Sequence, residues 1–431
     1  MSNAVLDINE KPSVGQLITF SFQHMFAMFG STILVPKLVG LSPSIALLTS
    51  GIATIIFLLV TQFKVPAYLG SSFAFISPII IVAGLTEAGV SINPGNAMMG
   101  AMLVGLVYAF VALIIWKTGY EWLMNILPPI VVAPVIIVIG LGLSGVAVDM
   151  AMNVNGEYNG LHFSAALVTL LTAIIVNVYF KNILSAMPIL LGIIVGYIYS
   201  VIIGIVDFTA VQEAKFFAVP DFLIPGVHYD LNFTWAIFLG MVPIVIVTIS
   251  EHIGHQLVLG KVVNRNYVKD PGLHRSILGD GLGTLASAFI GGPPKTTYGE
   301  NIGVLAITRV YSVYVILGAA VVAIVVSFSG QLMAIIETIP TAVLGGISIL
   351  LFGIIASSGL RMLVENNIDF GNNRNMVIAS VILVVGIGGA AMRFTESFAI
   401  EGMALASIIG VLLNLLLPGR EKVDKDIYET E

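Results

Sequence analysis

Apolar segments of about 20 residues recur along the whole chain, and this feature restricts the possible folds most strongly. A helix needs about 20 residues to cross the ~30 Å hydrocarbon core of a bilayer. Of the 431 residues, 58% are hydrophobic and only 10% are charged, and the mean hydropathy is +1.02. Such a chain has too few polar side chains to cover a soluble domain. The sequence therefore predicts an all-α integral membrane protein.

Twelve of these apolar runs are long enough to span a membrane. Two further apolar segments, around 68–85 and 294–309, are short and interrupted by glycine, proline and hydroxyl residues. With them the prediction is 14 transmembrane segments. The twelve long runs are 15–37, 44–63, 97–116, 122–145, 162–180, 187–206, 233–257, 276–291, 312–330, 341–360, 375–392 and 398–417.

The two interrupted segments resemble each other. Ser71-Ser72-Phe73 aligns with Thr296-Thr297-Tyr298, which indicates two halves of seven segments each. An odd number of spans per half inverts the second half relative to the first, and paired interrupted helices of this kind mark the midplane site of many transporters. We expect both segments to carry short extended strands that pair with each other.

The positive charges support this topology. With 14 spans and an internal N-terminus, 14 of the 18 Lys and Arg residues fall on the inside; the four assigned to the outside are Lys37, Lys215, Lys295 and Arg393. This bias follows the positive-inside rule and predicts cytoplasmic N- and C-termini. Residues 1–16 lack the basic and apolar regions of a cleavable signal, so the first span is expected to start insertion.

Ionisable residues within the apolar segments indicate a functional site, because a charge inside a bilayer is costly unless it faces a cavity or a partner. Glu251 and His255 are four residues apart on one predicted helix face and could share a proton. Glu300 opens the second interrupted segment. His252 and His255 could also hold a metal ion, but only if Glu300 arrived from another helix. Asp280 is expected near a cytoplasmic helix end, paired with backbone or with Arg309.

The interrupted segments also predict hydrogen-bond donors. A helix that begins at mid-membrane leaves its first N–H groups without partners. The N–H groups beside Phe73, Gly299 and Glu300 would therefore face a ligand with carbonyl acceptors.

The composition argues against an enzyme. The chain has no cysteine, no HExxH motif and no GxSxG sequence in a suitable context, so the common nucleophile and metal sets are missing. A channel would not need coupling carboxylates. Saturable, gradient-driven uptake would separate a carrier from a channel.

Residues 300–309, ENIGVLAITR, fit the signature of the nucleobase–ascorbate transporter family: Gln, Glu or Pro, then Asn, any residue, Gly, four residues, Thr, and a basic residue or Gly. Together with Gln23-His24, Gly70 to Phe73 and the Glu251 to His255 cluster, the whole chain resembles this family, and within it the branch that carries uracil.

The resemblance implies a core domain (1–118 and 233–330) that rocks against a gate domain (119–210 and 336–418), with a cytoplasmic tail at 419–431. It implies a homodimer in the plasma (inner) membrane that imports a nucleobase with protons. No other cofactor, no metal and no nucleic-acid partner are expected.

By position in the family, Glu251 and Glu300 would accept hydrogen bonds from the ring N–H groups of the ligand. The backbone at Phe73 and Gly299 would donate to its carbonyls, and Tyr298 and Ser31 would line the pocket. His255 would take part in proton coupling with Glu251.

The residues at two of these positions indicate the substrate. Purine-preferring relatives tend to carry Gln in place of Glu300 and Asp in place of His255, so uracil is expected. The alternatives are a purine such as xanthine or urate and, less favoured, an anion such as sulfate, which two glutamates would repel.

Overall fold

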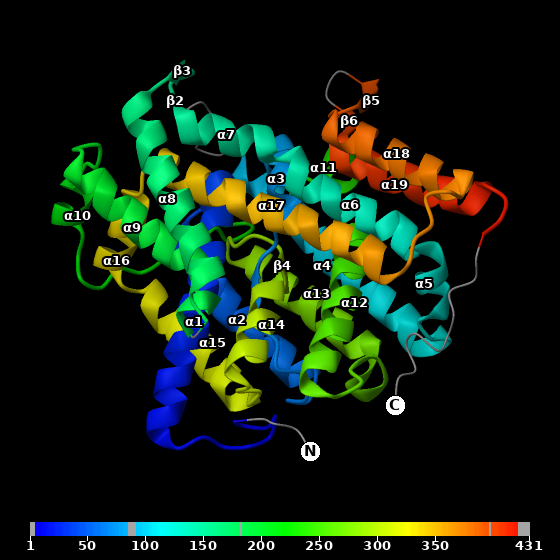
Figure 1. Cartoon of the computed structure of the whole chain (residues 1–431), viewed down its shortest axis with the longest axis horizontal. Coiled ribbons are helices and arrows are strands. Elements are labelled where there is room, and N and C mark those ends of the chain that lie inside the picture. The colour runs from blue at the N-terminus through cyan, green and yellow to red at the C-terminus, as the bar shows by residue number, and fades with distance from the viewer. Residues whose placement is uncertain (1–4, 85–91, 182, 396–397, 421–431) are drawn as a thin grey trace.

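The computed structural model of the chain describes residues 5–84, 92–181, 183–395 and 398–420. These form a helical assembly with three small two-stranded sheets (Figure 1). The last eleven residues of the predicted cytoplasmic tail, 421–431, lie outside the described residues, as does residue 85 at the end of the first interrupted segment.

The helices before the long central connection are α1 (Val14–Leu38), α2 (Pro43–Val60), η1 (Phe73–Phe75), α3 (Ile76–Ala83), α4 (Pro94–Thr118), α5 (Glu121–Ile126), α6 (Pro129–Gly142), α7 (Ser144–Met152), α8 (Gly160–Tyr179), η2 (Ile183–Ala186) and α9 (Pro188–Ile202).

The connection carries α10 (Thr209–Glu213). After it come α11 (Trp235–Met241), α12 (Ile244–Val263), η3 (Val268–Gly272), α13 (Leu273–Phe289), α14 (Gly299–Thr308), α15 (Val313–Ser327), α16 (Gly330–Glu337), α17 (Thr341–Glu365), α18 (Asn373–Ile387) and α19 (Gly402–Leu416).

The strands form three antiparallel pairs. They are β1 (Leu69–Ser71) with β4 (Lys295–Thr297), β2 (Asn153–Val154) with β3 (Glu157–Tyr158), and β5 (Ala391–Thr395) with β6 (Phe398–Glu401).

The predicted membrane class is confirmed at the level of the helices. Among the described residues, seven helical stretches are long and apolar enough to cross a bilayer, and further apolar helices have 10–17 residues. The count of fourteen crossings stays a prediction, because length and composition alone do not establish where each shorter helix lies in a membrane.

Prolines break two of the segments that the sequence predicts as single helices. The predicted span 122–145 divides at Pro128 and Pro129 into α5 and α6, and 233–257 divides at Pro243 into α11 and α12. Proline has no N–H to donate, and its ring disfavours helical backbone in the residue before it. The apolar periodicity runs through both breaks, so hydropathy alone did not reveal them.

The strands predicted in the two interrupted segments are present and pair with each other. Leu69 lies opposite Thr297, Gly70 opposite Thr296, and Ser71 opposite Lys295. One hydrogen bond extends the ladder at each end: Tyr298 N donates to Tyr68 O, and Ser72 N donates to Pro294 O, both at 3.0 Å. The extended backbone is therefore satisfied inside the protein, as non-helical chain at membrane depth requires.

A threonine from a neighbouring helix holds each strand. Thr54 Oγ1 on α2 accepts from Leu69 N at 2.9 Å, and Thr284 Oγ1 on α13 accepts from Lys295 N at 3.0 Å. Thr284 Oγ1 also donates to the carbonyl of Lys295 at 3.0 Å. Because the strands have only three residues each, these side chains supply much of what fixes the ladder in place.

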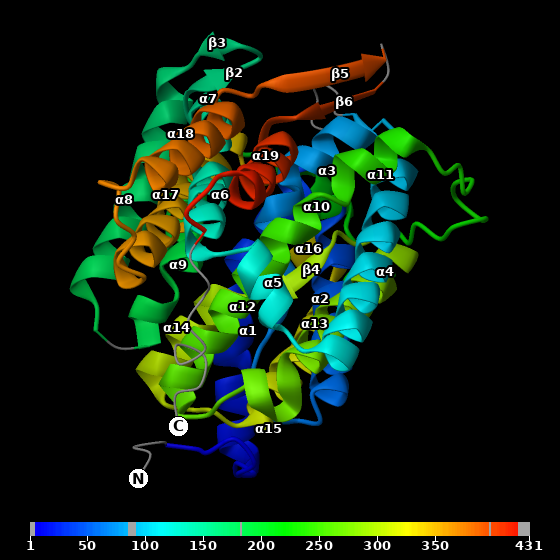
Figure 2. The same ribbon diagram turned by 90° about the vertical axis from the view of Figure 1, so that its right-hand side faces the viewer.

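The helices pack in two groups. In the first, α2 and α4 pack on α13, and α1 and α2 pack on α15; in the second, α6, α7 and α8 pack on α17, and α18 packs on α19. In the view of Figure 2, α8, α17 and α18 lie on one side, and α2, α4 and α13 lie on the other. Helices α1 and α12 contact members of both groups. The roles of these groups as core and gate domains stay a prediction.

The environment of Lys295 differs from the prediction. The fourteen-span topology places this residue among the outside cations, but its side chain is completely buried in the first position of β4. The positive-inside rule treats each cation as facing water, so it misses a lysine whose amine finds its partners within the protein.

Candidate functional site

The predicted site residues come from four elements that meet beside the β1–β4 ladder. Glu251 and His255 lie on α12, and Ser31 lies on α1. Phe73 opens η1 directly after β1. Tyr298, Gly299 and Glu300 follow β4, where Tyr298 is the N-cap of α14. Since α12 and α1 contact both helix groups, the residues gather at the junction between the groups.

Glu300 lies in the first turn of α14, where the positive end of the helix dipole favours a carboxylate. Ser31 Oγ donates a hydrogen bond to Glu300 Oε1 at 3.0 Å. Ser31 is completely buried, whereas Glu300 is only partly buried. The serine thus orients a carboxylate that remains partly accessible.

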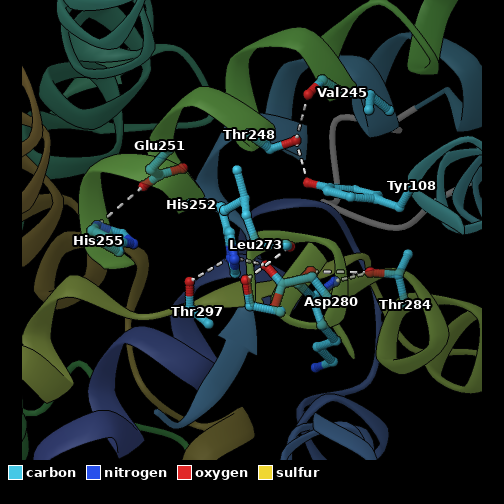
Figure 3. A network of polar contacts seen from close by, with 12 residues as sticks. Tyr108, Val245, Thr248, Glu251, His252, His255, Leu273, Asp280, Thr284 and Thr297 are labelled. Carbon is cyan, nitrogen blue, oxygen red and sulfur yellow. Dashed lines mark hydrogen bonds and ion pairs between the residues drawn. The ribbon is translucent and has the colours of Figure 1, made fainter. Parts of the chain in front are cut away.

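Glu251 and His255 face each other along α12, as Figure 3 shows. Glu251 Oε1 lies 4.0 Å from His255 Nε2, and the two side chains are 30% and 22% exposed. This separation is too long for a hydrogen bond. A small side-chain movement, or a bridging water molecule, would connect the two groups for proton transfer.

Gly299 brings the start of α14 against the same histidine. A methyl group added at Gly299 would lie 2.9 Å from His255 Nε2. The absence of a side chain therefore lets the imidazole approach the first turn of α14, in which Glu300 also lies. This contact joins the predicted coupling residue of α12 to the predicted binding residues of α14.

Phe73 and Gly299 are the first residues of their helices, η1 and α14. Within the described part of the chain, no backbone hydrogen bond uses the N–H group of either residue. Both residues are partly exposed, so the two donors can reach a ligand from opposite ends of the ladder. The prediction that these positions leave free donors agrees with the geometry, while ligand binding by them stays a prediction.

The side chain of Tyr298 is buried, so it supports the site and contributes little exposed surface to it. Its side chain is only 4% exposed, and its hydroxyl donates to Ser71 O at 3.0 Å. Its ring stacks on Phe73 with the centroids 6.4 Å apart, and it covers Gly70 so closely that a methyl group there would overlap it. The aromatic pair therefore packs across the ladder, with Phe73 as the more accessible ring.

The two histidines of α12 point in different directions. His252 points away from His255, into the protein, where its Nδ1 lies 2.8 Å from Asp280 Oδ2 (Figure 3). Among the residues that the structure describes, no group of three His, Cys, Asp or Glu side chains could hold a metal ion.

The His252–Asp280 pair corrects the expectation for Asp280. Both side chains are fully buried, and His252 Nδ1 also lies 3.2 Å from Thr297 Oγ1 of β4. Asp280 thus pairs with α12, and not with backbone at a helix end or with Arg309. The available signal was an aspartate inside an apolar segment, which is functional by default, but its partner is 28 residues away.

A second buried polar contact holds α12. Tyr108 of α4 donates its hydroxyl to Thr248 Oγ1, one turn before Glu251 (Figure 3). Thr248 in turn donates to the carbonyls of Ile244 and Val245. The helix segment that carries Glu251 is therefore fixed by a polar contact to α4 as well as by His252.

Comparisons with known proteins show the family of the chain. The model of a permease family, Xan_ur_permease, matches residues 15–394. A uracil permease of Bacillus caldolyticus is 63% identical over 430 residues, covering 100% of this chain and 98% of the relative. A uracil permease of Bacillus subtilis (strain 168) is 55% identical and covers 98% of each chain.

A solved structure shares the fold at low sequence identity. The transmembrane domain of BicA, a cyanobacterial bicarbonate transporter, superimposes with a TM-score of 0.67 and 16% identity, over 93% of this chain and 97% of that domain. At this identity the likeness concerns the fold and not the substrate.

Proposed function

The chain belongs to this permease family, and is therefore a multi-pass membrane transporter and not an enzyme; on that premise we propose that it imports uracil together with protons. Full-length relatives named uracil permease, at 63% and 55% identity, support uracil as the substrate. We further propose the plasma (inner) membrane as its location, with both termini in the cytoplasm, and a homodimeric assembly.

The proposal rests on one observation: backbone N–H donors and carboxylate acceptors for a ligand lie beside the same β1–β4 ladder. In the described part of the chain the N–H groups of Phe73 and Gly299 have no backbone partner, and the side chains of Glu251 and Glu300 are partly exposed. Uracil is a flat neutral ring that alternates N–H donors with C=O acceptors. The two backbone groups suit its carbonyls, and the two carboxylates suit its N–H groups.

Proton coupling is assigned to Glu251 and His255. Their 4.0 Å separation allows a proton to be shared after a small movement, and Gly299 lets the imidazole reach the start of α14. A proton held here changes the charge beside the ligand, so ligand binding and protonation become linked equilibria. No metal or organic cofactor is part of the proposal; the proton is the coupling ion.

We assign alternating access to a movement between the two helix groups. The core domain, 1–118 and 233–330, holds the ladder and the residues that bind uracil, and it moves against the gate domain, 119–210 and 336–418. Helices α1 and α12 contact both groups, so they form the sliding surface.

A purine substrate is the main alternative, because related permeases carry xanthine or urate. Glu300 and His255 stand where the purine-preferring members tend to have Gln and Asp. An anion such as sulfate is disfavoured, although the fold is shared with a bicarbonate transporter. The carboxylates of Glu251 on α12 and Glu300 in the first turn of α14 would repel it.

Binding measured on the purified protein with one series of ligands tests the substrate assignment. We expect uracil to bind and to be displaced poorly by xanthine, ascorbate or sulfate. A ligand that leaves a polar group of the site without a hydrogen-bond partner binds more weakly. Tighter binding of xanthine than of uracil would favour the purine alternative, and competition by sulfate would favour an anion.

A further inference from the structure

Lys295 is a buried lysine that the proposed transport cycle does not use. It occupies the first position of β4, opposite Ser71 of β1, and its side chain is 0% exposed. The side chain reaches across the ladder toward α2. A lysine in this setting requires partners for its amine, because an unpaired buried ammonium is very costly.

Three neutral oxygens provide those partners. Lys295 Nζ donates to Ala46 O at 2.8 Å, to Ser50 Oγ at 2.9 Å and to Ser71 Oγ at 3.2 Å. In the described part of the chain, the amine has no carboxylate within ion-pairing distance. The three donors of an ammonium group are thus matched by three acceptors.

The orientation of Ser50 agrees with a donating amine. Its own hydroxyl proton goes to Ala46 O, at 2.8 Å, so the oxygen is left to accept from Lys295. A helix carbonyl and two serine hydroxyls, gathered around one positive charge, are ligands that also suit a small monovalent cation.

We propose that the Lys295 ammonium is a built-in monovalent cation, which fills a three-oxygen site between α2 and the β1–β4 ladder that an inorganic cation would otherwise occupy. The tethered charge holds Ser71 of β1 and the adjacent α2 turn together without a dissociable ion. This part of the proposal does not depend on what the protein transports.

The consequence for transport rests on the proposed uptake of uracil. Because the cation position beside the ladder is permanently filled, Na⁺ has no role there, and coupling is left to the proton. Uptake by the unchanged protein should therefore be the same in sodium and in choline media.

The first experiment measures the melting temperature of the purified full-length protein. Lys295→Ala removes the tethered amine and leaves the oxygens, and Lys295→Met keeps a side chain of similar length without the charge. Melting is followed while NaCl, NH₄Cl or methylammonium chloride replaces choline chloride at constant ionic strength. For Lys295→Ala we expect a saturable rise of roughly 2 °C or more with at least one small cation, since a ligand stabilises the state that binds it.

The unchanged protein and Lys295→Met should show no such rise. Adding Ser71→Ala to Lys295→Ala removes one of the three oxygens and should shift the half-saturating cation concentration upward by at least about threefold. Equal salt responses in all variants, or no saturable response in Lys295→Ala, would overturn the proposal.

A second measurement keeps the test decisive if Lys295→Ala does not fold. The unchanged protein is reconstituted in vesicles, and uracil uptake under a fixed pH gradient is compared with sodium or choline outside. Equal initial rates support the built-in cation, whereas stimulation by sodium contradicts it. If the vesicles take up no uracil in either medium, the proposed substrate fails; the role of Lys295 is then decided by the melting experiment on Lys295→Ala, provided that this variant folds.

Discussion

Glu300 is the residue on which binding of the ligand is expected to depend most. Its carboxylate is oriented by Ser31 at 3.0 Å and lies in the first turn of α14. Glu300→Gln replaces a charged acceptor by an amide and should weaken uracil binding by about 1–3 kcal/mol, the value of a charge-assisted hydrogen bond in a buried site. This corresponds to a rise in Kd of roughly 5- to 150-fold, measurable by calorimetry.

Glu365→Gln is the matched control for this substitution. Glu365 is exposed at the end of α17, so the same chemical change there should leave the Kd unchanged. An unaltered affinity in Glu300→Gln would remove Glu300 from the binding site.

Gly299 is expected to tolerate no side chain. In Gly299→Ala the new methyl group would lie 2.9 Å from His255 Nε2 and beside the N–H that is proposed to meet the ligand. We expect uracil binding to fall by at least about tenfold, because contacts this short must shift the imidazole or the first turn of α14. Gly353→Ala in α17, where a methyl group meets no atom within 4 Å, is the control. Equal binding by both variants would show that the backbone at Gly299 does not contact uracil.

At the scale of the elements, the β1–β4 ladder connects the two interrupted helices and sets the position of both N–H donors. Gly70 is its most constrained residue, since a methyl group there would overlap the ring of Tyr298. Gly70→Ala should displace the Tyr298–Phe73 pair, lower the melting temperature and weaken uracil binding together. Normal binding with a lowered melting temperature would mean that the ladder supports the fold without positioning the ligand.

Much of this element could be predicted from the sequence. The match between Ser71-Ser72-Phe73 and Thr296-Thr297-Tyr298, with small residues around both, predicted two strands that pair. The positions of Phe73 and Gly299 at the helix starts followed from the same match. Local sequence is enough here because glycine and hydroxyl residues determine where a helix must stop.

The contacts that cross between helices were not predictable in the same way. His252 meets Asp280 because α12 and α13 bring their side chains together, and one sequence contains no signal for that pairing. Lys295 was assigned to the outside by the order of the fourteen predicted spans, which contains no information on the contacts of its side chain. Its three acceptors come from α2 and β1, more than 200 residues earlier in the chain.

At the scale of the whole molecule, transport is expected to need movement between the two helix groups. The chain has no cysteine, so a disulfide can be introduced without background. A Cβ atom placed at Gly30 of α1 would lie 3.3 Å from the Cβ of Ile189 on α9, close to the ~3.5–4.5 Å of a disulfide. The pair Gly30→Cys and Ile189→Cys should therefore stop uracil uptake on oxidation and restore it on reduction.

A second pair provides the control within one group. Ala173 on α8 and Gly192 on α9 bring their Cβ positions to 3.0 Å, and both lie in the predicted gate domain. Oxidising Ala173→Cys with Gly192→Cys should leave uptake unchanged. Full uptake after complete oxidation of the first pair would exclude movement of α1 against α9 as part of the cycle.

The central claim, proton-coupled import of uracil, is tested most directly by uptake of labelled uracil into vesicles that contain only this protein. With the outside more acidic than the inside, we expect uracil to accumulate above its external concentration, and an agent that dissipates the pH gradient should abolish the accumulation. Uptake that only reaches equilibrium, at the same rate with or without the gradient, would contradict the account.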